Sequence, residues 1–89
     1  MPVRRRLVVH GVVQGVGFRA WVWRAAQQRG ISGSARNVPD GTVEIVLEGE
    51  PDAVEALVGV CRAGPRGAVV TEVELFDEEP EGLSGFSAG

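Results

Sequence analysis

Hydrophobic and polar residues alternate along several short segments of this chain, which is the pattern of half-buried β-strands. In the first segment Leu7 and Val9 share one face, while Arg6 and His10 share the other. This pattern predicts four strands, over residues 4–13, 31–37, 42–48 and 68–77. The second is the weakest, because a glycine and two serines interrupt it. Residues 84–87 could add a very short fifth strand.

Two other segments repeat hydrophobic residues every three to four positions, which predicts helices with one buried face. The first runs from Phe18 to about Arg29, and Gly30 follows it as a residue suited to end a helix. The second runs from Pro51 to about Arg62, and proline is tolerated in a first helical turn because no hydrogen bond is lost there. The buried stripes are expected to be Phe18, Trp21, Val22, Ala25 and Ala26 in the first helix, and Val54, Leu57, Val58 and Cys61 in the second.

The resulting order, β-α-β-β-α-β, predicts an α+β fold. Two helices would cover one face of an antiparallel sheet, as in ferredoxin-like domains. Because strand–helix–strand crossovers are right-handed, the first two strands should lie parallel with the third between them. Their ends would emerge at one edge of the molecule, about 10 Å apart. The loop from Gln14 to Arg19 would then face the turn that begins at Asn37.

Composition narrows the class of protein. A chain of 89 residues is expected to form a single domain. Its net charge of −3 disfavours a nucleic-acid binder, and its nine basic residues are all arginine, which excludes a Walker-type loop that needs lysine. One cysteine excludes an internal disulfide, and no acidic, histidine or cysteine cluster has metal-ligand spacing. No apolar run is long enough for a membrane span, and no signal cleavage site is visible. We therefore expect a monomeric, cytoplasmic protein.

The loop Gln14-Gly15-Val16-Gly17-Phe18-Arg19 is the strongest candidate site in the chain. Gly15 and Gly17 allow successive backbone N–H groups to converge on one point, and the following helix adds its own unpaired N–H groups and positive dipole end. Arg19 falls in the first helical turn, where a cation is unfavourable by about 0.3–1 kcal/mol. A bound phosphate would make the same cation favourable. By itself, the loop is either an anion cradle or a tight turn beside a solvated arginine.

Two segments resemble the signatures of the acylphosphatase family. The first is Gly11–Arg19, and the second is Gly33–Val43, continuing to Gly49. Both have the family's spacing, and the likeness extends through Gly64-Pro65 to the last clear strand. The resemblance implies a single acylphosphatase-like domain over residues 1–89 that needs no cofactor or metal. Its substrate would be a small-molecule acylphosphate, hydrolysed at the carboxyl–phosphate bond to a carboxylate and inorganic phosphate.

The resemblance also implies residue roles. By position, Arg19 matches the phosphate-binding arginine of the family and Asn37 matches its water-positioning asparagine, so these two are the expected catalytic residues. The expected phosphate-binding set is Gln14, Gly15, Val16, Gly17, Phe18 and Arg19. Without the resemblance, Asn37 would be interpreted as a residue that often ends a strand before a turn.

Several other residues are expected to be structural or solvated. His10 lies mid-strand on the polar face, and Cys61 falls on a buried helix stripe. The charged residues Arg4, Arg5, Arg6, Glu44 and Glu48 are expected on solvated strand surfaces. The chain departs from the family at Ser34, where a large residue is usual. It also departs at Gly85–Gly89, which lack the usual strand-forming ending, and this leaves the fifth strand open. The rest of the acidic and glycine-rich tail is expected to fray.

Two alternatives stay open at this point. One is a non-catalytic ferredoxin-like binding module, which would need neither Arg19 nor Asn37. The other is a carbamoyl-phosphate-handling relative, because acylphosphatase-like domains open the large carbamoyltransferases of hydrogenase maturation. Because the chain starts at a methionine and stops after one domain, a free-standing enzyme is the preferred interpretation.

Overall fold

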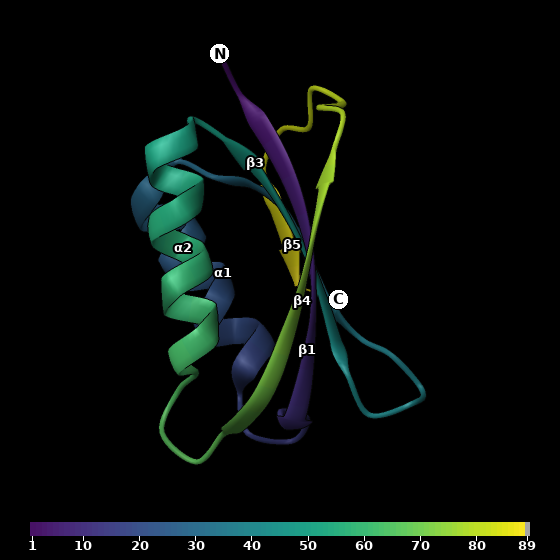
Figure 1. The fold of residues 1–89 in the computed structure, drawn as a ribbon. Helices are drawn as coiled ribbons and strands as arrows, with labels where there is room; N and C mark the ends of the chain where they lie inside the picture. Colours follow the sequence, from purple (N-terminus) through teal and green to yellow (C-terminus); the bar gives the residue numbers. More distant parts are fainter. Residues whose placement is uncertain (89) are drawn as a thin grey trace.

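The computed structural model describes residues 1–88 and contains a five-stranded sheet with two helices packed on one face (Figure 1). The elements are β1 (Val3–Val12), α1 (Phe18–Arg29), β2 (Ser32–Asn37), β3 (Val43–Gly49), α2 (Pro51–Ala63), β4 (Val69–Glu78) and β5 (Phe86–Ala88). The two helices and the first four strands lie within one residue of their expected positions. The predicted α+β fold is therefore confirmed.

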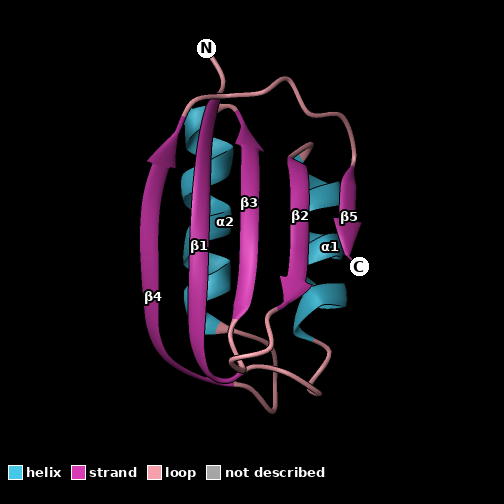
Figure 2. Ribbon diagram, turned by 90° about the vertical axis from the view of Figure 1, so that its right-hand side faces the viewer, coloured by secondary structure: helices cyan, strands magenta, loops and turns pink. Residues whose placement is uncertain are grey.

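The strands are ordered β4-β1-β3-β2-β5 across the sheet, with the helices behind it (Figure 2). β1 pairs antiparallel with both β3 and β4, and β2 pairs antiparallel with β3. β1 and β2 thus run parallel with β3 between them, as predicted from crossover handedness. Both strands finish at the same end of the sheet, and the N-terminus of α1 lies at that end too (Figure 2).

The core lies between the sheet and the two helices. The side chains of Leu7, Ile45 and Leu47 are fully buried on the sheet side, and those of Val22 and Leu57 on the helix side. Their positions follow the alternation of the strands and the stripes of the helices.

None of the helices in the described chain is long and apolar enough to cross a membrane.

Trp21 and Cys61 lie on the predicted buried stripes of α1 and α2, but they differ in how deeply they are buried. Trp21 is only half-buried and meets Phe18 edge-on, with ring centroids 6.0 Å apart. Cys61 is fully buried, and burial raises the pKa of its thiol to about 12. Such a thiol stays protonated and is a poor nucleophile. The interpretation of Cys61 as structural is therefore supported.

The short fifth strand, which the sequence left open, is present in the structure. After β4, residues 79–85 cross the end of the sheet to its opposite edge, where β5 pairs parallel with β2 (Figure 2). Phe86 is buried, and its carbonyl oxygen accepts a hydrogen bond of 3.1 Å from the Trp23 indole. The short fifth strand therefore forms, and it makes the sheet mixed. Gly89 lies outside the described residues.

The expectation of a solvated strand surface was wrong for Glu48, which is only 5% exposed. Its carboxylate accepts hydrogen bonds from the backbone N–H groups of Glu81, Gly82 and Leu83, at 2.9, 2.8 and 2.9 Å. A fourth comes from the Arg4 guanidinium at 3.2 Å. The Glu81 hydrogen bond and the other donors lower the pKa of Glu48, against the opposing effect of burial. We call residues 79–85 the crossing segment, and Glu48 is its anchor.

Arg4 is likewise not a solvated strand residue, since its side chain is only 11% exposed. Its guanidinium pairs with Glu78 at 2.9 Å as well as with Glu48. Arg6 also reaches Glu78, at 2.9 Å, and lies over the ring of Phe76. The helix-free face thus carries a network of opposite charges, which is worth more than isolated surface pairs.

Candidate active site

The loop after β1 has the backbone of an anion cradle. Gly15 and Gly17 adopt φ values of 75° and 78°, in the left-handed region that favours glycine. Gly17 precedes α1 without any side-chain cap, and the first helical turn contains no acidic residue. The first helical hydrogen bond is the 3.0 Å bond from Trp21 N–H to the Gly17 carbonyl. Within residues 1–88, the N–H groups of residues 15–19 have no acceptor, which leaves them available to an anion.

The turn after β2 lies across from this loop and is held by its own hydrogen bonds. Gly41 N–H donates to the Val38 carbonyl at 3.0 Å, and Val38 N–H donates to the Thr42 carbonyl at 2.9 Å. Asp40 Oδ1 accepts from the Thr42 hydroxyl and backbone N–H, at 2.6 and 2.9 Å, and the hydroxyl bond lowers the pKa of Asp40. Asn37 immediately precedes this turn as the last residue of β2. A hydrogen-bonded turn therefore follows the predicted water-positioning residue, and Asp40 is explained by the turn.

The side chain of Gln14 joins the loop to the turn. Its amide nitrogen donates to the carbonyl of Val38 at 2.8 Å and to that of Thr42 at 2.9 Å. Sequence analysis expected Gln14 to bind phosphate, but its side-chain N–H groups are engaged in the turn. Only the backbone of Gln14 remains for the cradle. The side chain of Gln14 thus contacts the turn, whereas residues 15–19 of the same motif have backbone N–H groups without an acceptor in the described chain.

A hollow of about 190 Å³ brings the two halves of the predicted site together. Its lining residues are Val13, Gly15, Gly17, Phe18, Arg19, Ala20, Asn37 and Ala88. Arg19 is half-buried and makes no ion pair with any other described residue, so its charge remains available. Arg19 and Asn37 therefore face one hollow, as the topology predicted. Val16 and the Gln14 side chain do not line it.

Ala88 is a lining residue that sequence reasoning missed. It reaches the hollow because β5 pairs with β2 in parallel, with Ala88 opposite Ala35. Only the partner strand places it there, and the tail carries no pattern strong enough to predict that pairing. The side chains of Ala88 and Ala20 are both small, which keeps the hollow open beside Asn37.

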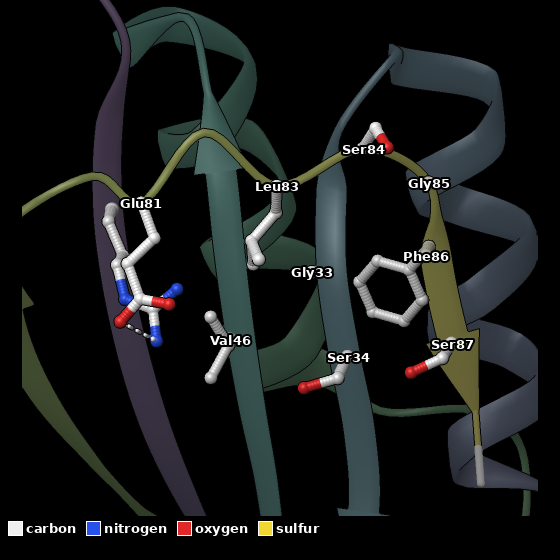
Figure 3. Close-up of a pocket in the computed structure, with 10 residues that line it drawn as sticks. Gly33, Ser34, Val46, Glu81, Leu83, Ser84, Gly85, Phe86 and Ser87 are labelled. Atoms are coloured by element: carbon white, nitrogen blue, oxygen red, sulfur yellow. Dashed lines mark ion pairs between the residues drawn. The ribbon is translucent and has the colours of Figure 1, made fainter.

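A larger hollow, of about 520 Å³, lies on the helix-free face under the crossing segment (Figure 3). Val46, Leu83 and Phe86 contribute apolar surface, and the small Ser34 leaves room beside them. Its charged groups, Arg4 and Glu81, pair with each other at 3.7 Å. Arg4, the cation that lines this hollow, is thus paired with carboxylates, unlike Arg19. The features suited to phosphate therefore belong to the smaller hollow.

His10 does not line the smaller hollow, and its partner is Glu74, with 2.6 Å between Nε2 and the carboxylate. This hydrogen bond raises the pKa of His10. In the part of the chain that the structure describes, no three histidine, cysteine or acidic side chains are grouped as metal ligands. His10 is thus paired with Glu74, outside the smaller hollow.

Known proteins similar to this chain share both its sequence and its fold. The acylphosphatase family model matches residues 5–88. An acylphosphatase of Thermococcus kodakarensis is 56% identical over 84 residues, which cover 94% of this chain and 92% of that protein. The acylphosphatase crystal structure from Bacillus subtilis matches with a TM-score of 0.95 and 35% identity, over 98% of each chain. T. kodakarensis HypF matches 98% of this chain with a TM-score of 0.85 and 30% identity, but only 12% of HypF is covered. The chain belongs to the acylphosphatase family.

Proposed function

We propose that this chain hydrolyses the carboxyl–phosphate bond of small acylphosphates to a carboxylate and inorganic phosphate. The observation that carries the proposal is the 190 Å³ hollow, which an unpaired arginine and Asn37 line together with Gly15 and Gly17 of the loop whose backbone N–H groups have no acceptor. The arginine and the N–H groups suit a phosphate dianion, and Asn37 suits a water molecule. A non-catalytic module of the same fold would need none of these to converge.

In the proposed reaction, the loop and Arg19 hold the phosphoryl oxygens. Arg19 offers paired charge-assisted hydrogen bonds, and the N–H groups of residues 15–19 stabilise charge that spreads over the equatorial oxygens. Phosphoryl transfer depends mainly on such positioning and charge stabilisation. The leaving group is a carboxylate, which departs without a proton, so no general acid is required.

Asn37 orients the attacking water in the proposed reaction. Its side-chain amide provides both a donor and an acceptor, which is enough to fix the direction of a water molecule for in-line attack. The phosphate of the substrate accepts the proton that the water loses, because no strong base lines the hollow. The water oxygen bonds to phosphorus while the bond from phosphorus to the carboxylate oxygen breaks. In this scheme Arg19 supplies the charge stabilisation that a metal ion would otherwise provide.

The acyl group is expected to lie beside Ala20 and Ala88, where few side chains could recognise it. We therefore propose a broad acyl specificity, with the phosphate as the main recognised group. We further propose that the protein acts as a monomer in the cytoplasm.

The decisive experiment measures hydrolysis of benzoyl phosphate by the wild type and by Arg19→Ala and Asn37→Ala. Each variant is expected to lose about 10²–10³-fold in kcat/KM, which is typical for removal of a preorganised charge-stabilising group. Arg24→Ala is the matched control, since Arg24 is an exposed arginine of the same helix that does not line the hollow. Near-full activity in either site variant would overturn the assignment of these residues.

Carbamoyl phosphate should be assayed beside acetyl and benzoyl phosphate. A clear preference for the carbamoyl compound would favour a carbamoyl-phosphate-handling protein over a general acylphosphate hydrolase. Absence of hydrolysis with all three would instead favour the binding-module alternative.

A further inference from the structure

Gln14 has hydrogen-bond acceptors for both N–H groups of its side-chain amide. Its amide nitrogen carries two hydrogens, and each has an acceptor, at 2.8 Å on the Val38 carbonyl and 2.9 Å on the Thr42 carbonyl. The acceptors lie 24 and 28 residues further along the chain. The side chain is half-buried between the two segments. Gln14 therefore makes a two-point tertiary contact.

The contact joins the two halves of the proposed site. Gln14 immediately precedes Gly15, where the cradle begins, and its two acceptors bracket the turn that follows Asn37. No backbone ladder joins β1 to β2, because β3 lies between them in the sheet. The distance between cradle and Asn37 is thus set partly by a side chain. Figure 2 shows that the loop and the turn both lie at the same end of the sheet.

We propose that Gln14 is a positioning residue that sets the placement of Asn37 relative to the bound phosphoryl group. The inference rests on the proposed function, and it gives Gln14 a role other than phosphate binding. Attack in line requires water and phosphorus to be placed within a fraction of an ångström, and a shift of about 1 Å can cost about 10²-fold in rate. Gln14 would therefore affect the attack step far more than it affects phosphate affinity.

The turn should survive the loss of Gln14. Its two acceptors are also used by the turn itself, because Val38 O accepts from Gly41 N–H and Thr42 O accepts from Val38 N–H. Neither carbonyl is left without a donor when the Gln14 side chain is removed. A change at position 14 should thus alter placement while leaving the fold intact.

The test compares Gln14→Leu and Gln14→Glu with the wild type. The leucine removes both donors at similar size, and the glutamate keeps the shape but turns carboxylate oxygens toward two carbonyl oxygens. The matched controls are Gln28→Leu and Gln28→Glu, on an exposed glutamine of α1 outside the site. Four quantities are measured for each protein: kcat and KM with benzoyl phosphate, the inhibition constant of inorganic phosphate, and the thermal unfolding midpoint.

Both Gln14 variants are expected to lose about 10- to 100-fold in kcat. The phosphate inhibition constant of Gln14→Leu should stay within about threefold of wild type, because the cradle and Arg19 are unchanged; Gln14→Glu adds a negative charge beside the cradle and should also bind phosphate more weakly while it is deprotonated. Gln14→Glu should regain part of its kcat, relative to wild type, as pH falls and its carboxyl group gains a proton that can be donated. Gln14→Leu should show no such recovery. The Gln28 controls should match the wild type in every quantity.

Two results would overturn the inference. One is a kcat within about twofold of wild type in both variants. The other is a loss of phosphate affinity in Gln14→Leu that equals its loss of kcat, which would return Gln14 to the cradle. If Gln14→Leu fails to fold, Gln14→Glu decides alone, since its relative kcat either recovers at low pH or does not. Failure of the proposed function itself would appear separately, as a wild type that does not hydrolyse benzoyl phosphate.

Discussion

Each end of the sheet has consecutive backbone N–H groups suited to an anion, but only at one end does the chain itself supply that anion. At one end, the consecutive N–H groups of Glu81, Gly82 and Leu83 converge on the carboxylate of Glu48. At the other end, the N–H groups of residues 15–19 have no acceptor among residues 1–88. A cradle whose anion comes from the chain itself is a structural joint. A cradle without one is open to a ligand.

The arginines at the two ends differ in the same way. Arg4 is 11% exposed, and its charge is shared among Glu48, Glu78 and Glu81. Arg19 is half-buried, and no described carboxylate pairs with it. The contact of Arg4 with Glu48 is thus an internal counterpart of the proposed contact between Arg19 and phosphate. The comparison predicts that changes at one end should affect stability, and changes at the other should affect activity.

The largest expected effect separates activity from stability at Arg19. Arg19→Gln should lose about 10²–10³-fold in kcat/KM, because the phosphoryl charge is no longer stabilised. The same change removes a cation from a helix N-terminus, so the ligand-free protein should be equally stable or gain up to about 0.3–1 kcal/mol. Benzoyl phosphate kinetics and urea unfolding measure the two effects. A variant that loses stability would show that Arg19 has a structural partner.

The next effect concerns Glu48→Gln, which should lower stability rather than activity. Here activity should stay close to wild type, while the free energy of unfolding falls by about 1–3 kcal/mol, since charge-assisted hydrogen bonds to the crossing segment and to Arg4 are weakened. Urea unfolding measures the loss. The matched control is Glu44→Gln, a less buried carboxylate on the same strand, which should cost about 0–1 kcal/mol. Equal losses in both variants would contradict a special role for the crossing segment.

The pH dependence of stability sharpens the same point. Hydrogen bonds, first that from Glu81 N–H, lower the pKa of Glu48 in the folded protein. Its contribution to stability is therefore fully present above the unfolded pKa of about 4.3 and is lost as pH falls through the folded value. Unfolding midpoints measured between about pH 6 and 3 should fall less steeply in Glu48→Gln than in the wild type. Parallel curves would show that Glu48 does not titrate differently in the folded state.

The smallest expected effect is at His10. The hydrogen bond to Glu74 raises the pKa of His10, and the nearby Glu72 and Asp40 act in the same direction. Its contribution is present below the unfolded pKa of about 6.5 and is lost as pH rises through the folded value. His10→Gln should flatten a shallow decline in stability above neutral pH and leave kcat unchanged. A change in kcat would place His10 in the site after all.

Local patterns were enough to predict most of the fold. Alternation located four strands, and the helix stripes located both helices, because each element's burial pattern is written within a few consecutive residues. The glycines of the cradle and the odd placement of Arg19 were visible for the same reason. Handedness of the crossovers then placed Asn37 opposite the loop.

What the sequence could not reveal depends on which distant segments come to lie together. Glu48 looked like any solvated strand carboxylate, and only the crossing segment, over thirty residues later, buries it. The donors of Gln14 have partners that only the paired strands bring within reach. Ala88 lines the hollow only because β5 adds to β2. The sequence by itself determined the elements and the open cradle, whereas the tertiary structure decided which polar groups are satisfied internally and which are left for a ligand, because that depends on contacts across the whole chain.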